Sequence, residues 1–401
     1  MTVGIVTEET VEAVRRRIGI PTRHRQRFHN ELCSGDSFRH FAEGYGDDNP
    51  LFCNSDYAKS SCWGDLIAPP MYPISAGRLR SVEWTESEAA AMGGGDPLAG
   101  VGQYMCGERW VFVKPVRPGV TLHREQSLFD ARLKSSKFGG GTGALVSHRV
   151  SWGDFEGSPY CFRFLDFWHA ERDKSARAGK YRSLKRAHYD DEELARIDAC
   201  YEAEEVRGAD LRLASTVAVG DEIGPIVKGP LCTTDIICYH VAIGFGGYGG
   251  GTAKQAYKAR RRIPKFYQKN SFGFWDSAQR CHWEDEWAQQ MGHPAAYDYG
   301  AMRTNWMVNL LTNWMGDNAW LWKLTASIRK FNYMGDTHFL SGSVISIDTS
   351  TGAVEIYVKG TNQRDVVTCD GTAVVILPTE RETKIVVPEF DPSDIPEPQA
   401  P

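Results

Sequence analysis

The stretch of sequence that decides the fold is GDDNPLFCN, residues 46–54. A glycine followed by two carboxylates, an asparagine and a proline is typical of a tight turn, because Asp and Asn side chains accept hydrogen bonds from the backbone that follows them. The same residues can also carry chemistry, since a carboxylate beside an amide can act as an acid or a base. For Asp47 and Asn49 the structural and the catalytic interpretation therefore stand side by side.

The composition is that of an ordinary globular protein. The chain has 401 residues, of which 42% are hydrophobic and 24% are charged, and this length predicts two or three domains. The formal net charge of −5 argues against a nucleic-acid partner held by charge. No window approaches the roughly 18 apolar residues of a membrane span, so we expect no membrane partner.

The start of the chain and its cysteines predict a cytoplasmic protein. Residues 1–20 contain three glutamates and no long apolar run, which is unlike a secretory signal. The ten cysteines are scattered, and no two show the Cys-x-x-Cys spacing of a zinc or redox site. We therefore expect reduced thiols, no metal and no bound cofactor.

Two halves follow one another along the chain, and each places a helical stretch before strand-like segments. In the second half Met302, Trp306 and Leu310 recur every four residues, which predicts a wide apolar stripe on a buried central helix. Residues 145–152 and 371–377 have the apolar or alternating pattern of strands. Helices followed by antiparallel strands indicate an α+β fold.

The predicted architecture is a double hot dog, in which two antiparallel sheets are each wrapped around a central helix. We expect an N-terminal hot-dog domain over 1–170, a connector over 171–210, a C-terminal hot-dog domain over 211–380 and a flexible, acidic, proline-rich tail over 381–401. Open sheet edges commonly pair with one another, so we also expect a homodimer.

Seven short motifs are spread over both halves. They are FAEGYGDDNPL (41–51), APPMYP (68–73), WVFVKPVRPGVT (110–121), VKGPL (227–231), CHWE (281–284), AYDYG (296–300) and NWMGD (313–317). In this order they resemble the two-domain MaoC-like hydratases and dehydratases of the hot-dog fold. The first half is similar to the dehydratase-type domain of that family, and the second half to its C-terminal MaoC domain.

The resemblance implies a reaction on an acyl thioester. The family adds water to a 2-enoyl-CoA or removes water from a 3-hydroxyacyl-CoA. An Asp and a His hold one water and exchange protons with the substrate, while a backbone N–H at the start of the central helix stabilises the enolate oxygen. CoA enters as part of the substrate, with no other cofactor.

In the first half, the resemblance assigns an acid or base role to Asp47 and an orienting role to Asn49. The family's pattern continues with a histidine and a second aspartate, but Phe52 and Asn54 fill these positions here. A water held by one carboxylate lacks its second proton carrier. We therefore favour the structural interpretation and expect this half to lend a wall to the acyl pocket.

In the second half, His282 fills the family's histidine position and is the expected general base. Ser277 stands in the family's aspartate position, so Asp276 or Glu284 is the expected carboxylate partner. The alternative is that His282 is a structural histidine at the start of a short helix.

The start of the central helix is the expected oxyanion and substrate site. Gly300 occupies the position whose amide meets the thioester oxygen, and Tyr299 replaces the family's histidine in that turn. Asp298 is placed to cap the helix. The alternative is that Gly300 serves only close packing at the helix start.

A glycine-rich stretch, 244–251, precedes Lys254, Arg260 and Arg261. It lacks the Gly-Lys-(Ser/Thr) sequence of a phosphate-binding P-loop. One interpretation is a lid whose cations meet the phosphates of CoA, and the other is a surface loop.

Three functions follow from these observations. The first is a lyase that hydrates a 2-enoyl-CoA or dehydrates a 3-hydroxyacyl-CoA, with the Asp/His pair incomplete in both halves. The second is a different lyase or isomerase step on an acyl thioester at an altered site. The third is a catalytically degenerate subunit that only binds acyl-CoA.

Overall fold

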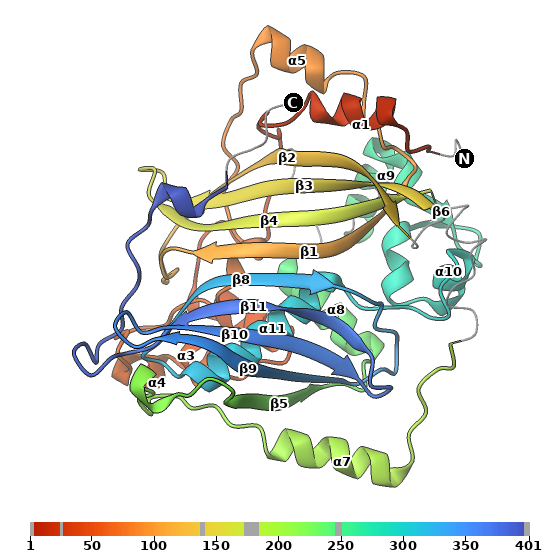
Figure 1. The fold of residues 1–401 in the computed structure, drawn as a ribbon. Helices are drawn as coiled ribbons and strands as arrows, with labels where there is room; N and C mark the ends of the chain where they lie inside the picture. Colours follow the sequence, from red (N-terminus) through yellow and green to blue (C-terminus); the bar gives the residue numbers. More distant parts are fainter. Residues whose placement is uncertain (1–3, 25–26, 137–140, 172–183, 245–250, 397–401) are drawn as a thin grey trace.

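The centre of the molecule is a single nine-stranded antiparallel sheet (Figure 1). The computed structural model describes residues 4–24, 27–136, 141–171, 184–244 and 251–396. The strand order is β2-β3-β4-β1-β8-β11-β10-β9-β5, so the first half of the chain supplies four strands and the second half supplies five. An antiparallel sheet covered by helices confirms the α+β class.

The secondary-structure elements divide between the two halves. Those of the first half are α1 (Glu8–Arg15), α2 (Gly35–Glu43), α3 (Pro50–Cys53), α4 (Ser55–Ser60), η1 (Tyr72–Ser75), α5 (Glu86–Met92), β1 (Gly102–Phe112), β2 (His123–Ser136), β3 (Gly141–Gly153) and β4 (Pro159–Ala170). Those that follow are α7 (Asp191–Glu202), η2 (Ala214–Thr216), β5 (Glu222–Lys228), α8 (Thr233–Ile243), α9 (Lys254–Arg262), η4 (Pro264–Phe266), β6 (Tyr267–Lys269), β7 (Trp275–Ser277), η5 (Ala278–His282), α10 (Asp285–Gln290), α11 (Gly300–Met315), β8 (Trp320–Ile328), β9 (His338–Asp348), β10 (Ala353–Asn362), β11 (Val367–Ile376) and η6 (Pro392–Asp394).

The two expected sheets are joined into one by β1 and β8. Residues 107–111 of β1 pair in antiparallel register with residues 323–327 of β8. Gly107 lies at this seam, where a Cβ atom would come within 2.9 Å of the Ala326 carbonyl oxygen. The close approach of the two backbones therefore requires glycine, and each half keeps its own curved part of a shared sheet.

The predicted central helix of the second half is α11, which crosses the concave face of the sheet. It has 16 residues and is buried almost all round, as expected for a helix whose apolar stripe is so wide. It packs on β1, β5, β8, β9 and β10, and it ends at Gly316, whose φ of +75° favours glycine. No helix among the described residues is both long and apolar enough to cross a membrane.

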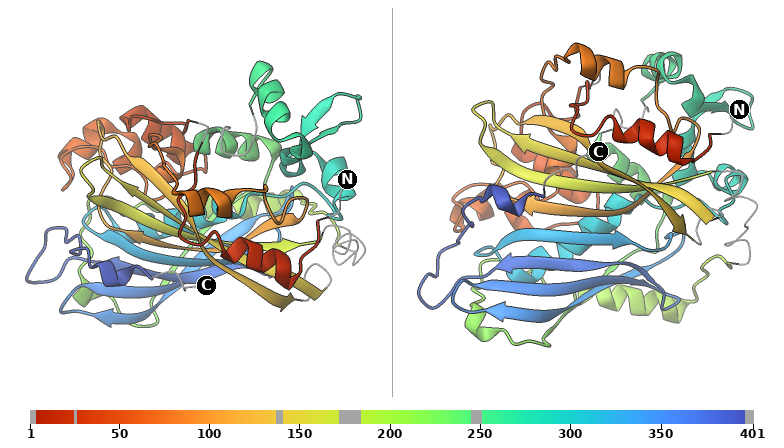
Figure 2. Two further views of the ribbon diagram at one scale, coloured as in Figure 1. Left: turned by 90° about the horizontal axis from the view of Figure 1, so that it is seen from above. Right: turned by 45° about the horizontal axis from the view of Figure 1, so that its top comes forward.

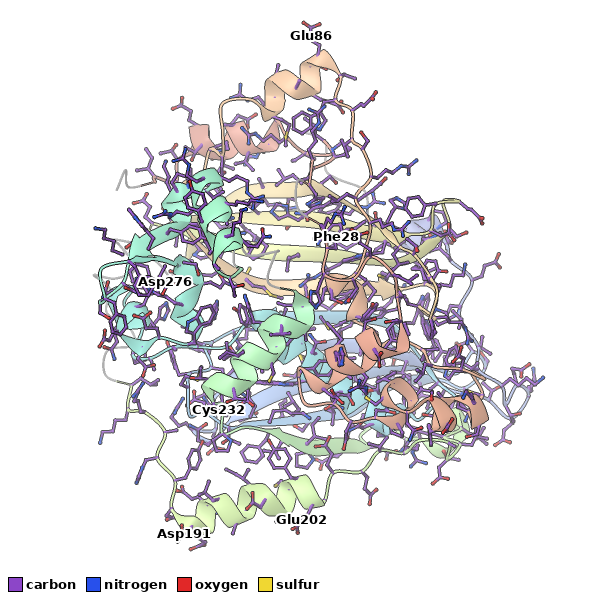
Figure 3. The ribbon with its side chains drawn as sticks, turned by 180° about the vertical axis from the view of Figure 1, so that it is seen from behind. Phe28, Glu86, Asp191, Glu202, Cys232 and Asp276 are labelled. Carbon is purple, nitrogen blue, oxygen red and sulfur yellow. The ribbon has the colours of Figure 1, made fainter. Side chains whose placement is uncertain are left out.

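In the first half, several short helices occupy the position of the expected central helix. α2, α3 and η1 cover this part of the sheet, with α8 beside them (Figure 3). Phe38 of α2 packs edge to face against Tyr72 of η1 at 4.7 Å. Trp110 stacks between Phe112 and Trp152 on the strands below. Aromatic packing thus replaces a long helix as the core of this half.

Three segments lie outside the double hot dog. The connector contains α7, and its stretch 172–183 falls outside the described residues. α9 and the β6–β7 hairpin project from the body (Figure 2). The tail was expected to be flexible, but it packs on the outer face of the sheet as far as residue 395. Phe390 stacks on Phe162, and Asp394 forms an ion pair with Lys323 at 2.6 Å.

We predict that Trp306→Ala destabilises the fold by about 3–5 kcal/mol, because it leaves a cavity between the halves. Trp306 is buried on α11, and its indole N–H donates to the Tyr45 carbonyl oxygen of the first half at 3.1 Å. Urea unfolding measures the loss, with Val219→Ala, at a side chain 65% exposed, as the control. A Trp306→Ala variant as stable as that control would contradict this role for α11.

Candidate functional site

The turn that contains Asp47 is closed by hydrogen bonds within the turn itself. Asp47 is 1% exposed, and its Oδ1 accepts from the Asn49 backbone N–H at 3.0 Å while its Oδ2 accepts from the Tyr45 hydroxyl at 2.9 Å. The Asn49 side chain accepts from the Leu51 N–H and caps α3. With both carboxylate oxygens engaged, the geometry favours the structural interpretation of this motif.

The electrostatics of this turn tie the two halves together. Burial raises the pKa of Asp47 to about 6, and the Asn49 N–H and the Lys228 ammonium oppose that rise. Lys228 comes from β5, and its Nζ donates to the Gly46 carbonyl oxygen at 2.6 Å. Phe52, in the family's histidine position, is buried in the core. Asp47 therefore lies beside the Tyr45 hydroxyl and has no imidazole at position 52.

A small, largely apolar cavity of about 40 Å³, partly open to solvent, lies next to this turn. Asn49 and Phe52 line it, together with Trp63, Tyr160 and Met315. Met315 is the last residue of α11, and the 16 residues of that helix span about 24 Å. The cavity thus lies at the opposite end of α11 from Gly300.

His282 lies at the other end of α11, on η5. Its Nδ1 is 2.7 Å from the Tyr297 carbonyl oxygen, and its ring stacks on Tyr299 with centroids 3.9 Å apart. A carbonyl oxygen only accepts hydrogen bonds, so Nδ1 carries the proton and Nε2 carries the lone pair. The ring has a further hydrogen bond with the Asp298 backbone.

The surroundings of His282 keep it uncharged. Burial lowers the pKa of His282 to about 4, and the Tyr297 carbonyl only partly opposes this effect. The nearby His240 and His293 imidazoles add to the lowering. At neutral pH the ring is therefore a neutral base with a fixed tautomer.

The expected carboxylate partners of His282 face elsewhere. Asp276, on the β6–β7 hairpin (Figure 3), lies 3.8 Å from Arg280, and Glu284 lies 3.2 Å from the same guanidinium. Arg280 is buried over the Trp287 ring, so the two acids neutralise a buried cation. Among the described residues no carboxylate hydrogen-bonds His282, and the prediction of an Asp276 or Glu284 partner is corrected accordingly.

The start of α11 supplies backbone donors next to His282. Tyr299 is the N-cap residue, and the N–H groups of Gly300 and Ala301 open the helix without intrahelical acceptors. A Cβ on Gly300 would lie 3.1 Å from the Met105 sulfur of β1, so glycine lets the helix start approach the sheet. Two free donors and the positive end of the helix dipole favour a developing oxyanion here.

Asp298 does not cap α11, which corrects the prediction from sequence. It lies one residue before the N-cap. Its Oδ2 forms an ion pair with Arg303 Nε at 3.0 Å and accepts a hydrogen bond from the Asn332 amide, also at 3.0 Å. Burial raises the pKa of Asp298 to about 6, while the Arg303 guanidinium opposes that rise. The ion pair between Asp298 and Arg303 fixes residues 297–299 against α11.

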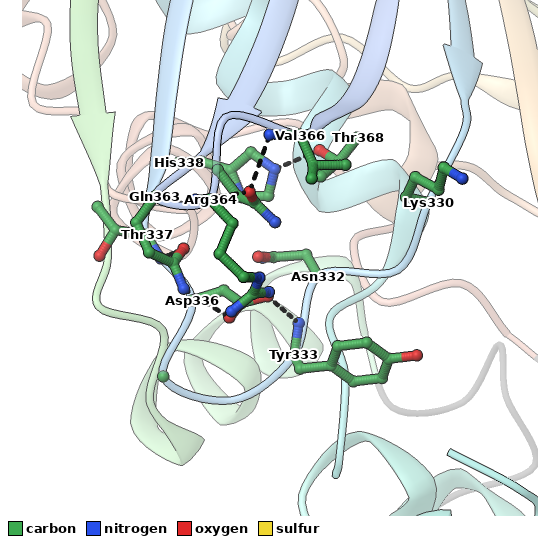
Figure 4. A network of polar contacts seen from close by, with 12 residues as sticks. Lys330, Asn332, Tyr333, Asp336, Thr337, His338, Gln363, Arg364, Val366 and Thr368 are labelled. Atoms are coloured by element: carbon green, nitrogen blue, oxygen red, sulfur yellow. Dashed lines mark hydrogen bonds and ion pairs between the residues drawn. The ribbon is translucent and has the colours of Figure 1, made fainter. Parts of the chain in front are cut away.

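The loop between β8 and β9 also holds residues 297–299 in place. The Asp298 N–H donates to the Asn332 carbonyl oxygen at 3.0 Å. Asp336 rigidifies this loop by accepting from the Tyr333 N–H, from Gln363 and from Arg364 (Figure 4). Buried polar groups that are paired in this way give a single well-defined position to Tyr299 and Gly300.

Two residues that sequence reasoning missed meet Tyr299 in the interior. His240 of α8 places Nδ1 2.8 Å from the Tyr299 hydroxyl, and the Gln279 amide donates to that oxygen at 3.2 Å. All three side chains are buried. Gln279 stands three residues before His282, as Asn49 stands three residues before Phe52, so the motif spacing could have found it. His240 follows no motif, and only the position of α8 beside Tyr299 brings it here.

The predicted cations lie apart from this cluster, on α9. Lys254 and Arg261 are exposed, and the Arg260 guanidinium lies over Trp275 at 5.4 Å. Residues 245–250 of the glycine-rich stretch fall outside the described residues, so the lid is a prediction there. A role for the cations in binding CoA phosphates likewise stays a prediction.

Known proteins share this fold and part of this sequence. Residues 22–159 match the family model described as the FAS1-like dehydratase domain region. No curated protein matches the chain. A structure named MaoC-like dehydratase is 14% identical with a TM-score of 0.60, and the alignment covers 90% of this chain and 98% of that one.

Two further solved structures are similar. A MaoC-like dehydratase from Phytophthora capsici is 11% identical with a TM-score of 0.52, over 92% of this chain and 99% of that one. A conserved hypothetical protein from Mycobacterium tuberculosis with a double hot-dog fold is 12% identical with a TM-score of 0.50, over 86% and 92%. These likenesses confirm the predicted double hot-dog fold.

We predict that the protein loses stability as the pH falls from 7 to 5. Burial lowers the pKa of six described histidines to about 4: His24, His148, His169, His240, His282 and His293. Below about pH 6.5 the unfolded chain binds protons that the folded chain refuses, so acid favours unfolding.

The raised pKa values of Asp47, Asp298, Glu204 and Asp317 act in the opposite direction. They are four groups against eight, because burial also lowers the pKa values of His29 and His338. The melting temperature is therefore expected to be several degrees lower at pH 5 than at pH 7. An unchanged or higher melting temperature at pH 5 would contradict the neutral, buried state of these imidazoles.

Proposed function

We propose that this chain, a double hot-dog protein of the MaoC-like family, hydrates a 2-enoyl-CoA or dehydrates a 3-hydroxyacyl-CoA at the start of α11. The observation that carries the proposal is His282 itself. Its Nδ1–H is committed to the Tyr297 carbonyl, and its ring stacks on Tyr299, the residue that directly precedes the N–H groups of Gly300 and Ala301 at the helix start. A general base next to an oxyanion site is the arrangement that hydration of an enoyl thioester requires.

In the hydration direction, His282 Nε2 takes a proton from water as the water oxygen bonds to Cβ. The electron pair of the carbon–carbon double bond moves onto Cα and the thioester oxygen. The N–H groups at the start of α11 stabilise that oxygen, and the helix dipole adds to their effect. A proton delivered to Cα then completes the 3-hydroxyacyl product.

The first half is proposed to bind rather than to react. Its cavity is apolar where the family carries a histidine, because Phe52 lines it. An apolar wall of this kind suits an acyl group, and the polar side chains of Lys114, Tyr160 and Asp317 line other parts of the cavity. The exposed cations of α9 are proposed to meet the CoA phosphates, and the edge strands β2 and β5 are proposed to pair in a homodimer.

Two other functions follow from the lack of a carboxylate at His282. A catalytically inert subunit would bind acyl-CoA without converting it, and a different lyase or isomerase would convert the thioester without adding water. Product analysis of a mixed reaction separates these possibilities, since only hydration forms a 3-hydroxyacyl-CoA.

We predict that His282→Ala lowers kcat for a 2-enoyl-CoA by about 10²-fold or more, because the base is lost. The loss of the enone absorbance of crotonyl-CoA and of bulkier enoyl-CoA substrates measures the rate. Asp47→Asn is the matched comparison, and this variant should keep kcat within about threefold while it lowers stability. Turnover that survives His282→Ala but is abolished by Asp47→Asn would move the chemistry to the first half.

We also predict that kcat/KM stays constant as the pH falls from 7 to about 5 and declines only as the pH approaches 4. The base must be unprotonated to accept a proton from water, and burial holds the pKa of His282 at about 4. Initial rates in overlapping buffers, corrected for unfolding, measure this profile. An acidic limb centred near 6.5 would contradict the assignment, because that is the pKa of an ordinary solvated histidine.

A further inference from the structure

Residues 251–277 form a unit that projects from the double hot dog and consists of α9, η4 and the β6–β7 hairpin (Figure 2). The hairpin is anchored at its base, where Tyr267 and Ser277 pair with each other and are buried. Its turn lies at the far end and carries Phe272, whose side chain is 85% exposed. The projecting end of the hairpin therefore contributes nothing to the core of the molecule.

Exposed aromatic side chains gather on this projecting unit. Phe272 stacks on Phe274 with ring centroids 6.1 Å apart, and Phe274, Trp275 and Tyr257 are also exposed. The Arg260 guanidinium lies over the Trp275 ring at 5.4 Å and over the Tyr257 ring at 5.7 Å, which joins the hairpin to α9. A contiguous group of exposed aromatic residues marks an interaction surface, whereas scattered ones do not.

Positive charge surrounds these aromatic residues. Residues 251–277 contain seven Lys or Arg residues and one Asp, although the whole chain has a formal net charge of −5. Lys254, Lys258 and Arg261 follow one another at intervals of four and three residues, so they share one exposed face of α9. Lys269 is exposed and lies directly opposite Trp275 in the hairpin. The projecting unit is thus both basic and aromatic.

We propose that the projecting unit binds the surface of a membrane that contains anionic lipids. Its cations contact the lipid phosphates. Phe272, Phe274 and Trp275 enter the boundary between headgroups and acyl chains, where aromatic side chains are favoured. The sequence-based expectation of no membrane partner concerned a spanning segment, and a surface contact needs none. This inference goes beyond the proposed function and does not depend on it.

Charge and shape favour a bilayer over a protein partner. A symmetric contact between two copies would place this surface against itself, and facing like charges oppose such a contact. An acidic protein would need a pocket that matches the projecting turn, because specific protein interfaces are closely complementary in shape. A lipid layer accepts the turn at Phe272 without a preformed pocket.

Two of the cations test the membrane contact separately from the binding of CoA. Lys254, Arg260 and Arg261 are proposed above to meet the CoA phosphates. Lys258 and Lys269 have no part in that proposal, although both are exposed on the same unit. Substitution of these two lysines therefore changes the charge of the surface and leaves the proposed CoA contacts in place.

Sedimentation of the full-length protein with vesicles tests the proposal, in the absence of any thioester. One set of vesicles is phosphatidylcholine alone, and the other is phosphatidylcholine and phosphatidylglycerol in equal parts. The wild type should sediment with the anionic vesicles and not with the neutral ones. Salt should weaken this binding, because the Debye length falls to about 3 Å at 1 M ionic strength.

Two double variants should lose binding to the anionic vesicles. Phe272→Ser combined with Phe274→Ser should lower the partition coefficient at least about tenfold, because the apolar contact is lost. Lys258→Gln combined with Lys269→Gln should lower it about 30-fold at low salt, because each cation near an anionic surface contributes a factor of about five.

Matched controls come from elsewhere on the surface. Phe155, between β3 and β4, is 54% exposed, and the Lys59 side chain on α4 is 64% exposed. Phe155→Ser and Lys59→Gln should bind the anionic vesicles as the wild type does. Circular dichroism and urea unfolding show that each variant is folded.

Three outcomes would overturn the proposal. The first is a wild type that stays in solution with anionic vesicles, and its binding to polyglutamate instead would assign the surface to an acidic protein. The second is vesicle binding that Phe155→Ser weakens as much as the Phe272 and Phe274 substitutions do. The third is a homodimer that the substitutions at Phe272 and Phe274 dissociate in analytical ultracentrifugation, without wild-type binding to vesicles. Failure of the proposed hydratase activity would alter none of these measurements.

Discussion

The structure depends on the burial of α11. A helix with bulky apolar side chains on nearly every side cannot be covered by one small sheet, so the sheet must surround it. The joining of β1 to β8 provides that cover, because it makes one continuous surface from both halves. Trp306 then contacts the first half through the Tyr45 carbonyl, and neither half buries this helix by itself.

Burial of α11 also fixes where chemistry can occur. The helix presents free backbone donors only at its start, and that start is held by buried polar contacts rather than by a side-chain cap. Asp298 and Arg303 lose hydration in this position, and the cost is offset by their mutual contact and by Asn332. Such a pair contributes more to the precise placement of Tyr299 and Gly300 than to overall stability.

The periodic parts of this design could be read from the sequence. The four-residue spacing in α11 and the alternating strands predicted the fold class. The partners of individual side chains could not be predicted from the sequence, because they depend on the register of each strand. Asp276 is one residue from the family's aspartate position, and in a strand this shift turns the side chain to the other face, toward Arg280.

Contacts between elements that are far apart in the sequence also could not be predicted. His240 approaches Tyr299 because α8 crosses beside the start of α11, and no local pattern reports that crossing. The tail illustrates the same point, since its composition suggests flexibility whereas Phe390 finds an aromatic partner on β4. Propensity describes a segment in isolation, and long-range packing overrides it.

The two ends of α11 explain how a duplicated fold can hold unequal sites. At the first-half end, replacement of the histidine by Phe52 leaves a largely apolar cavity beside a turn whose carboxylate is fully satisfied. At the other end, the carboxylates are drawn to Arg280, and an aromatic and imidazole cluster remains around the helix start. The two ends of one helix thus differ in character, with an apolar cavity at one end and a polar, imidazole-containing cluster at the other.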